Sequence, residues 1–452
     1  MEREALNVLL LVLEGARADH LSCAGYERET TPFLDQIARQ GVRFTHAFTT
    51  APSSLAAHAS MFTGLFPSLH GATEETGLLD SGPPVLAECF KAAGYRTAAF
   101  CPDPVIGPET GFGRGFDRFY TQRAGGRIAG RAADYARRAS DRVLGRGDAG
   151  ARRTTQTLLD WLAAGHGPFF AFVHYREPRR PIHPPAPYDR AFGAARLTSA
   201  QVPRMRQRIG GRERSASRDE AAELAARHDG ALRYGDLRLQ QIADALAGEG
   251  CWEQTLLIVT ASYGEDLGEG GSADGANLLH DARLRVPLVL RCPGRIPAGF
   301  VVEEFAQPVD LLPTIAALTG CPLAAPVQGR ALLTVSGATA GPPMVIAEAF
   351  RPSARGAARG GEAGAADVRR KAVRTRREKF VWQSDEANAL YDVAADPGER
   401  RNLAAGEPER ADRLRRRLFD WLAESQRWAL ERGLSLEPTG RRVVRERRGA
   451  AE

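Results

Sequence analysis

The feature that most constrains the fold is an uninterrupted apolar run close to the start of the chain. Residues 7–13 read Asn-Val-Leu-Leu-Leu-Val-Leu, with no alternation between apolar and polar positions. A strand of this kind needs cover on both faces, as in the centre of a parallel sheet between two layers of helices. Similar runs recur at residues 97–101, 168–174, 255–260, 286–291 and 344–347.

Segments with helical spacing separate these runs, at residues 31–40, 85–93, 154–164, 221–248 and 309–318. Strands that alternate with helices predict an α/β fold with a large, mostly parallel sheet flanked by helices. Such sheets place their chemistry at the carboxyl ends of the strands. The residues that follow Leu13, Val173 and Thr260 are therefore the first place to look for a site.

Changes in composition predict the domain organisation. Two segments rich in arginine and other charged or small residues interrupt the strand and helix pattern, and a Gly/Ala/Arg segment has no periodicity. Beyond it, strand-like and helical spacing predict a smaller C-terminal α+β subdomain. The predicted boundaries are 1–350 for the large domain, with surface insertions near 122–153 and 204–219, 351–367 for a linker, 368–436 for the C-terminal subdomain and 437–452 for a disordered tail.

Composition excludes several classes of protein. The chain has 452 residues and a formal charge of +6, and its basic residues are almost all arginine. These arginines are not interleaved with aromatic residues, which argues against a nucleic-acid platform. The apolar run at 6–13 is too short to span a bilayer and lacks a signal-peptide cleavage region. The six cysteines form no CxxC pair, so the sequence predicts buried thiols in a cytoplasmic protein.

Several motifs carry a resemblance to a known family. Residues 7–21, NVLLLVLEGARADHL, resemble the opening of type I sulfatases, and residues 51–64, APSSLAAHASMFTG, resemble their nucleophile segment. Further matches follow in order up to LYD at 390–392 and DPGE at 396–399. The chain is thus identified as a divergent member of the sulfatase family in the alkaline-phosphatase-like superfamily. The resemblance implies the fold described above, with the smaller subdomain at the C-terminus.

The resemblance also implies a divalent cation, Ca²⁺ or Mg²⁺, held by oxygen ligands. Relatives carry an Asp, often followed by Asp or Thr, after the first strand, where this chain has Glu14 and Gly15. They carry Asp-His or Asp-Asn before a glycine in a second arm, where this chain has Ser262 and Tyr263. Most of the expected metal ligands are therefore missing. Glu14 and Asp266 remain as candidate ligands, although Glu14 could instead pair with an arginine and Asp266 could belong to a solvated acidic loop.

The nucleophile of the family aligns with Ser54. Conversion to formylglycine needs a proline two residues later and usually an arginine four residues later, where this chain has Ala56 and His58. We therefore expect no formylglycine and an unmodified serine. With a metal or base to lower its pKa this serine could attack an ester, with His58 one helical turn away. Alternatively, its hydroxyl only caps a helix.

A set of basic residues suggests an anion site. Arg179 stands where relatives carry a histidine that contacts the ester. Together with His174, His183 and Arg17 it could bind an anion without any metal. Tyr263, after a central strand, is a candidate acid or base.

Two functions from different classes follow. The first is an atypical or inactive sulfatase homologue, a pseudoenzyme, that binds an anionic small molecule or an acidic protein partner. The second is an active sulfuric- or phosphoric-ester hydrolase or transferase that uses Ser54 with a relocated divalent metal. Metal-free chemistry that uses Tyr263 is a third possibility, and nothing in the sequence names a substrate.

Overall fold

The computed structural model describes residues 5–121, 148–193, 218–268, 278–334, 337–351, 368–384 and 387–434. The predicted insertions lie outside these ranges except for residues 148–153 and 218–219. The predicted linker, apart from residue 351, and the predicted tail also lie outside them. Among the described residues, no helix combines the length and apolarity needed to cross a bilayer.

An eight-stranded sheet forms the centre of the molecule, in the order β4-β3-β5-β1-β6-β7-β2-β8. The first apolar run is β1, Asn7–Leu13, and it pairs in parallel with a strand on each side. Every pairing in the sheet is parallel except the two that β7 makes. The strands are β2, Val42–Ala47; β3, Arg96–Phe100; β4, Arg118–Tyr120; β5, Phe169–Tyr175; β6, Thr255–Thr260; β7, Leu288–Arg291; and β8, Phe300–Ala306.

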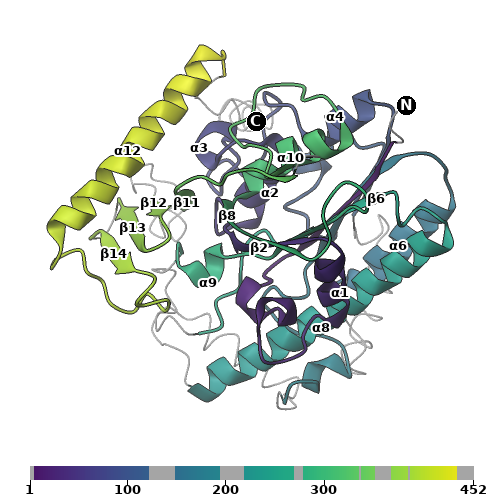
Figure 1. Cartoon of the computed structure of the whole chain (residues 1–452), viewed down its shortest axis with the longest axis horizontal. Helices are drawn as coiled ribbons and strands as arrows, with labels where there is room; N and C mark the ends of the chain where they lie inside the picture. The colour runs from purple at the N-terminus through teal and green to yellow at the C-terminus, as the bar shows by residue number, and fades with distance from the viewer. Residues whose placement is uncertain are drawn as a thin grey trace, which may run out of the picture.

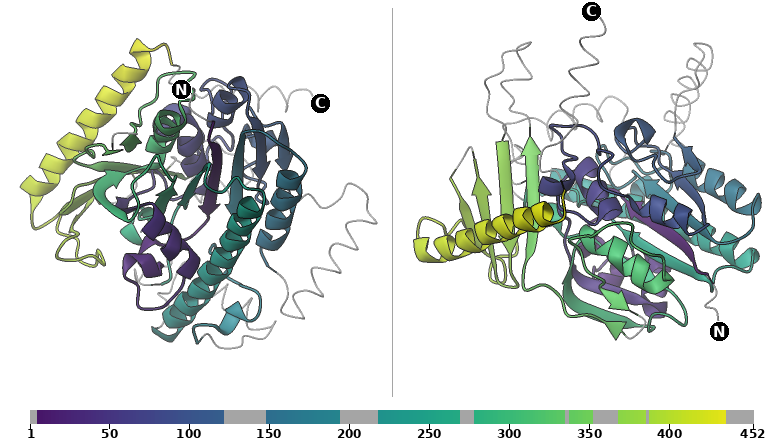
Figure 2. Two further views of the ribbon diagram at one scale, coloured as in Figure 1. Left: turned by 45° about the vertical axis from the view of Figure 1, so that its right-hand side comes forward. Right: turned by 90° about the horizontal axis from the view of Figure 1, so that it is seen from above.

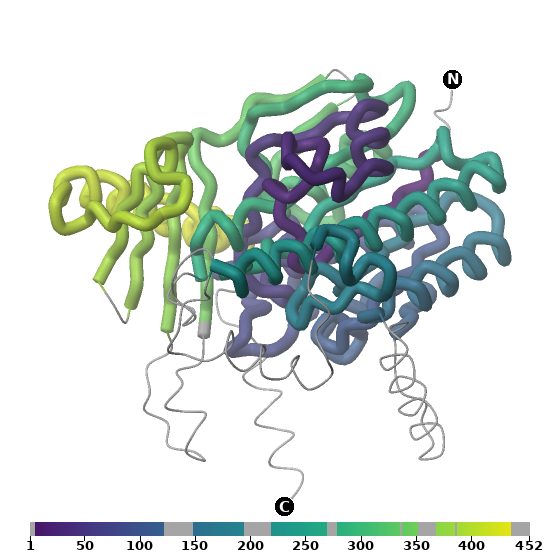
Figure 3. The backbone as a smooth tube through the Cα atoms, turned by 90° about the horizontal axis from the view of Figure 1, so that it is seen from below, coloured from purple at the N-terminus to yellow at the C-terminus, as the bar shows by residue number. Residues whose placement is uncertain are grey.

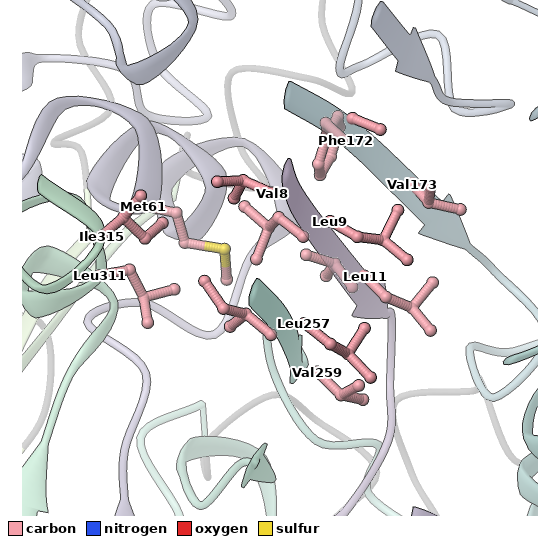
Figure 4. Close-up of a cluster of buried hydrophobic side chains, with 14 of the residues drawn as sticks. Val8, Leu9, Leu11, Met61, Phe172, Val173, Leu257, Val259, Leu311 and Ile315 are labelled. Atoms are coloured by element: carbon pink, nitrogen blue, oxygen red, sulfur yellow. The ribbon is translucent and has the colours of Figure 1, made fainter. Parts of the chain in front are cut away.

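Helices cover both faces of this sheet, as the continuous apolar runs require (Figure 1). One layer contains α1, Pro32–Gln40, α6, Ala151–Ala163, and α8, Arg218–Gly248. The other contains α2, Ser54–Thr63, α3, Pro67–His70, α4, Leu86–Ala92, and α10, Leu311–Thr319. Figure 4 shows β1 side chains between those of β5 and β6, with Met61 of α2 close by. The α/β fold with a mostly parallel sheet is confirmed.

A second, four-stranded antiparallel sheet lies at one end of the molecule (Figures 2 and 3). It contains β11, Val345–Arg351, β12, Val368–Arg374, β13, Glu378–Gln383, and β14, Ala389–Asp392, and α12, Pro408–Glu431, packs against it. A short pair, β9, Leu333–Thr334, and β10, Gly337–Ala338, completes the described strands. The predicted α+β character of the C-terminal part is confirmed.

Buried ion pairs join the second sheet to the first domain. Lys379 on β13 is fully buried, and its Nζ donates to Asp281 Oδ1 at 2.9 Å and to Glu399 Oε1 at 2.7 Å. Arg374 on β12 donates from Nε to Asp281 Oδ2 at 2.8 Å. Asp281 begins the short helix α9, Asp281–Leu284, which leads back into β7. The position of α9 therefore depends on residues from the C-terminal sheet.

Candidate functional site

Glu14 lies at the centre of the candidate site, directly after β1 and fully buried. Its backbone N–H donates to Tyr175 O at 2.8 Å, and the N–H of Gly15 donates to Tyr263 O at 3.1 Å. These bonds extend the parallel pairing beyond the strand ends. Glu14 is thus held rigidly where the carboxyl ends of β1, β5 and β6 meet, as the topology predicts.

Arg179 links Glu14 to a second buried carboxylate, Asp103. Its Nη1 donates to Asp103 Oδ2 at 2.7 Å and lies 3.4 Å from each oxygen of Glu14. Burial raises the pKa of Glu14 above its usual value, although the nearby guanidinium opposes the shift. Burial would also raise the pKa of Asp103, but a hydrogen bond from Val105 N–H and the neighbouring basic groups lower it. Arg179 thus bridges the two carboxylates, and Arg176 Nε lies 3.3 Å from Asp103 Oδ2 as a second cation.

Gly15 determines how closely the Arg179 backbone approaches the end of β1. Its φ is +87°, in the left-handed region that glycine adopts readily. A Cβ at this position would lie 2.8 Å from Arg179 Cα and 2.9 Å from its backbone nitrogen. A side chain of any kind at position 15 therefore excludes the observed path of residues 178–179.

Ser54 is the first residue of α2 and is half-buried. Its Oγ lies 3.4 Å from His58 Nδ1, and its side chain is close enough to Glu14 to lower the pKa of that carboxyl. The preceding N-cap residue, Ser53, makes no side-chain capping hydrogen bond, and its buried Oγ has no partner. The N–H groups at the start of α2 are therefore not satisfied by a serine cap.

The hydrogen bonds of His58 define its tautomer. Its Nδ1 lies 2.7 Å from Ser54 O, and a carbonyl oxygen can only accept, so Nδ1 must carry the proton. The same nitrogen cannot then accept a proton from the Ser54 hydroxyl. Burial, with His174 nearby, lowers the pKa of His58 to about 4. His58 is thus a neutral side chain whose lone pair is on the buried Nε2, which has no hydrogen-bond partner.

His174 lies on β5 beside Glu14 and is also fully buried. Its Nε2 is 3.5 Å from Glu14 Oε2, and its Nδ1 is 3.3 Å from Cys101 Sγ. Burial lowers its pKa to about 3 even though Asp103 opposes the shift. The His174 and His58 rings meet edge to face with their centroids 4.9 Å apart. This side of the site is therefore uncharged.

Tyr263 and Arg283 form the opposite side. Burial raises the pKa of Tyr263 well above its usual value, with Glu14 and Glu265 adding to the shift. The Cζ of Arg283 lies 5.8 Å from the centroid of the Tyr263 ring, and Nη2 donates to Pro52 O at 3.4 Å. Arg283 is half-buried and makes no salt bridge with any residue in the described ranges, although its charge lowers the pKa of the buried Glu265 carboxyl against the effect of burial. Its charge is available next to the start of α2.

The remaining predicted site residues have other surroundings. Arg17 is buried and pairs with Asp19 at 2.7 Å. Asp266 is half-buried, and its Oδ1 accepts a hydrogen bond from Gly268 N at 2.8 Å. His183 is half-buried on the segment that follows Arg179.

Two residues of the site, Asp103 and Arg283, did not emerge from the sequence. Asp103 lies three residues beyond β3, so the rule that sites follow strand ends could have found it. Arg283 precedes β7, a strand antiparallel to its neighbours, and that rule does not apply to it.

The described residues do not fit the divalent cation that the resemblance implies. Ca²⁺ takes about six to eight oxygen ligands, and Mg²⁺ requires near-octahedral oxygen coordination. Within the described part of the chain, Glu14 and Asp103 already contact the Arg179 guanidinium, and the third buried carboxylate nearby, Glu265, pairs with Arg180 at 3.4 Å. A divalent cation between Glu14 and Asp103 would be repelled by the Arg179 charge.

A second group of possible ligands, His20, His228 and Asp229, is buried behind the loop that carries Gly15. Asp229 accepts hydrogen bonds from Tyr26 and Arg28 and lies 2.7 Å from His20 Nδ1. His228 Nε2 donates to Gly15 O at 3.0 Å. These contacts give the group a structural role, which is to hold Gly15 in place.

Comparisons with known proteins agree with this architecture. The chain is 26% identical to the multifunctional alkaline phosphatase superfamily protein PehA of Trinickia caryophylli, over 72% of this chain and 76% of the relative. It is 26% identical to human arylsulfatase A, over 88% of this chain and 83% of that protein. The solved phosphonate monoester hydrolase of Agrobacterium radiobacter superposes with a TM-score of 0.75 at 23% identity, covering 93% of this chain and 96% of that one. The model of the Sulfatase family matches residues 6–321, well over half of the chain. The chain therefore belongs to the sulfatase family, whose fold it shares.

Proposed function

We propose that this sulfatase-family protein binds an anionic ligand at the site beside Ser54, without a divalent cation. The observation that carries the proposal is the position of Arg283 next to the start of α2, where it makes no direct salt bridge with a carboxylate of the described residues. Unsatisfied N–H groups at a helix N-terminus attract anions, and a guanidinium offers a fork of donors that matches a sulfate or phosphate group. The two features together suit a sulfo or phospho group.

The state of His58 argues against a conventional serine and histidine pair. Its proton is on the nitrogen that faces Ser54, so this histidine cannot act as the base for the Ser54 hydroxyl. The proposal therefore assigns binding, and not ester cleavage, to the site. An acidic protein partner for the arginine-rich insertions stays a prediction, because those segments lie outside the described ranges. A reducing, cytoplasmic setting suits the six free thiols.

Calorimetric titration of protein treated with a chelator tests the proposal, with inorganic phosphate, inorganic sulfate and phenyl phosphate as probes. We expect binding without added metal. Arg283→Ala should weaken it about 10- to 100-fold, because a hydrogen bond to a charged group contributes about 1.5–3 kcal/mol. Arg295→Ala is a matched control, since Arg295 is also half-buried and donates to a backbone carbonyl, Leu318 O, at 3.4 Å. Binding that requires an added divalent cation would contradict the proposal.

An active ester hydrolase or transferase is the second candidate. It is favoured by the closeness of Ser54 to Glu14, a carboxyl whose burial raises its pKa. In this scheme Ser54 Oγ forms a bond to phosphorus or sulfur as the ester P–O or S–O bond breaks, and Glu14 takes the serine proton and returns it to the departing oxygen, which leaves as an alcohol. Water, or a second alcohol in a transferase, then displaces Ser54 Oγ from phosphorus or sulfur. A relocated metal could assist. Turnover of 4-nitrophenyl phosphate or sulfate that Ser54→Ala abolishes, with a phosphorylated or sulfated Ser54 seen by mass spectrometry, would establish this candidate and refute the first.

A further inference from the structure

Two fully or nearly fully buried carboxylates meet at the same guanidinium in this protein. Glu14 is 0% exposed and Asp103 is 2% exposed. The guanidinium of Arg179 contacts both, at 3.4 Å and 2.7 Å, and Arg176 Nε lies 3.3 Å from the same Asp103 oxygen. Buried carboxylates are stable only when a cation or several hydrogen-bond donors compensate them. Arg179 therefore performs at Glu14 the neutralising task that a bound metal ion would otherwise perform.

Gly15, which follows Glu14, packs closely against the backbone of the same arginine. A Cβ at position 15 would lie within 3.0 Å of the Pro178 carbonyl carbon and of the Arg179 backbone. An aspartate at position 15, which the resemblance to sulfatases would imply, cannot coexist with the observed position of Arg179. Gly15 is therefore linked by steric contact to the backbone path of residues 178–179, from which the Arg179 side chain reaches Glu14.

We propose that Arg179 is a resident cation that takes the place of a divalent metal between Glu14 and Asp103, and that its removal creates a site for a hard divalent cation. Without the guanidinium, the two carboxylates and the Ser54 hydroxyl would face one another with water to complete the coordination of Ca²⁺ or Mn²⁺. The inference deepens the proposed metal-free anion site. It does not depend on which anion that site binds.

Metal titration of chelator-treated wild type, Arg179→Ala and Arg179→Gln tests this inference. Each protein is titrated with CaCl₂ and with MnCl₂, and binding is followed by calorimetry and by the shift in melting temperature. We expect the wild type to bind no cation in a Glu14-dependent manner. Each variant should gain one site, with a dissociation constant on the order of 10⁻⁴–10⁻³ M, the range of the weaker protein Ca²⁺ sites. The Glu14-dependent affinity of each variant for the cation should be at least tenfold higher than that of the wild type.

Two controls identify the site. Arg180→Ala removes the adjacent arginine, which pairs with Glu265 at 3.4 Å, and should create no cation site. Adding Glu14→Gln to Arg179→Ala should abolish the new site. Where an Arg179 variant unfolds without metal, saturating Ca²⁺ or Mn²⁺ should restore a cooperative melting transition.

Three outcomes would overturn the inference. These are a Glu14-dependent cation site in the wild type, no gain of binding in folded Arg179 variants, and unfolded variants that neither cation restores. Anion binding by the wild type is a separate measurement that depends on Arg283. If the wild type binds no anion, the proposed function is refuted but the inference about Arg179 still stands. If the Arg179 variants gain no cation site, the inference is refuted but the anion-binding result is unaffected.

Discussion

Replacement of Gly15 by alanine should destabilise the protein strongly for two separate reasons. The first is backbone strain, because φ is +87° and a non-glycine residue in the left-handed region costs about 1–2 kcal/mol. The second is steric overlap, because the new methyl group would lie 2.8 Å from Arg179 Cα, and the neighbour is backbone that cannot rotate away. Overpacking of this kind costs about 1–3 kcal/mol. The expected loss in the free energy of unfolding is therefore about 2–5 kcal/mol.

Gly25 provides the matched control. Its φ is +94°, but a Cβ added there would have no atom within 4 Å. Gly25→Ala should therefore show only the backbone strain, about 1–2 kcal/mol. Urea denaturation of both variants, with the slopes compared to verify that the same surface unfolds, measures the difference. Equal losses in the two variants would refute the argument that the Arg179 backbone is packed against position 15.

Two further predictions concern buried ionisable side chains. Lowering the pH from 6.5 to 4 should reduce the free energy of unfolding, because burial lowers the pKa of His70 to about 3 whereas the unfolded chain takes up its proton near pH 6.5. Urea denaturation of His70→Asn across this range should show a shallower pH dependence, and an unchanged dependence would contradict the assignment. Lys379→Met should cost about 3–5 kcal/mol, because it leaves the buried Glu399 and the mostly buried Asp281 without their ammonium partner. Arg377→Met is the control, because Arg377 is largely exposed and pairs with Asp392 at the surface, and it should leave the free energy of unfolding almost unchanged in the same assay. Similar losses of unfolding free energy in the two variants would contradict the prediction.

The central strands were predictable because burial on both faces leaves a signal that needs no tertiary information. β1, β5 and β6 are apolar throughout and carry that signal. β2 reads Val-Arg-Phe-Thr-His-Ala and is only partly buried, and β8 is an edge strand with exposed Phe300 and Val301. Neither produces a continuous apolar run, so neither was predicted.

The site was predictable only in its parts. The sequence indicated that Arg179 belongs to the site and that Glu14 could pair with an arginine. It could not indicate that these two residues pair with each other, because they are 165 positions apart and their approach depends on the backbone of Gly15. Asp103 follows β3, so the strand-end rule points to its neighbourhood, but no periodicity in that irregular segment identifies which residue turns toward Glu14.

The ion pairs of Lys379 have a consequence for the order in which the site is completed during synthesis. Asp281, at the start of the helix that carries Arg283, is anchored by Arg374 and Lys379, which are made 93 and 98 residues later. Domains generally fold from the N-terminus as the ribosome delivers them. A nascent chain that ends before β12 can therefore already contain β1 and the Glu14 that follows it, but the side of the site that presents Arg283 acquires its anchors only when the C-terminal sheet emerges.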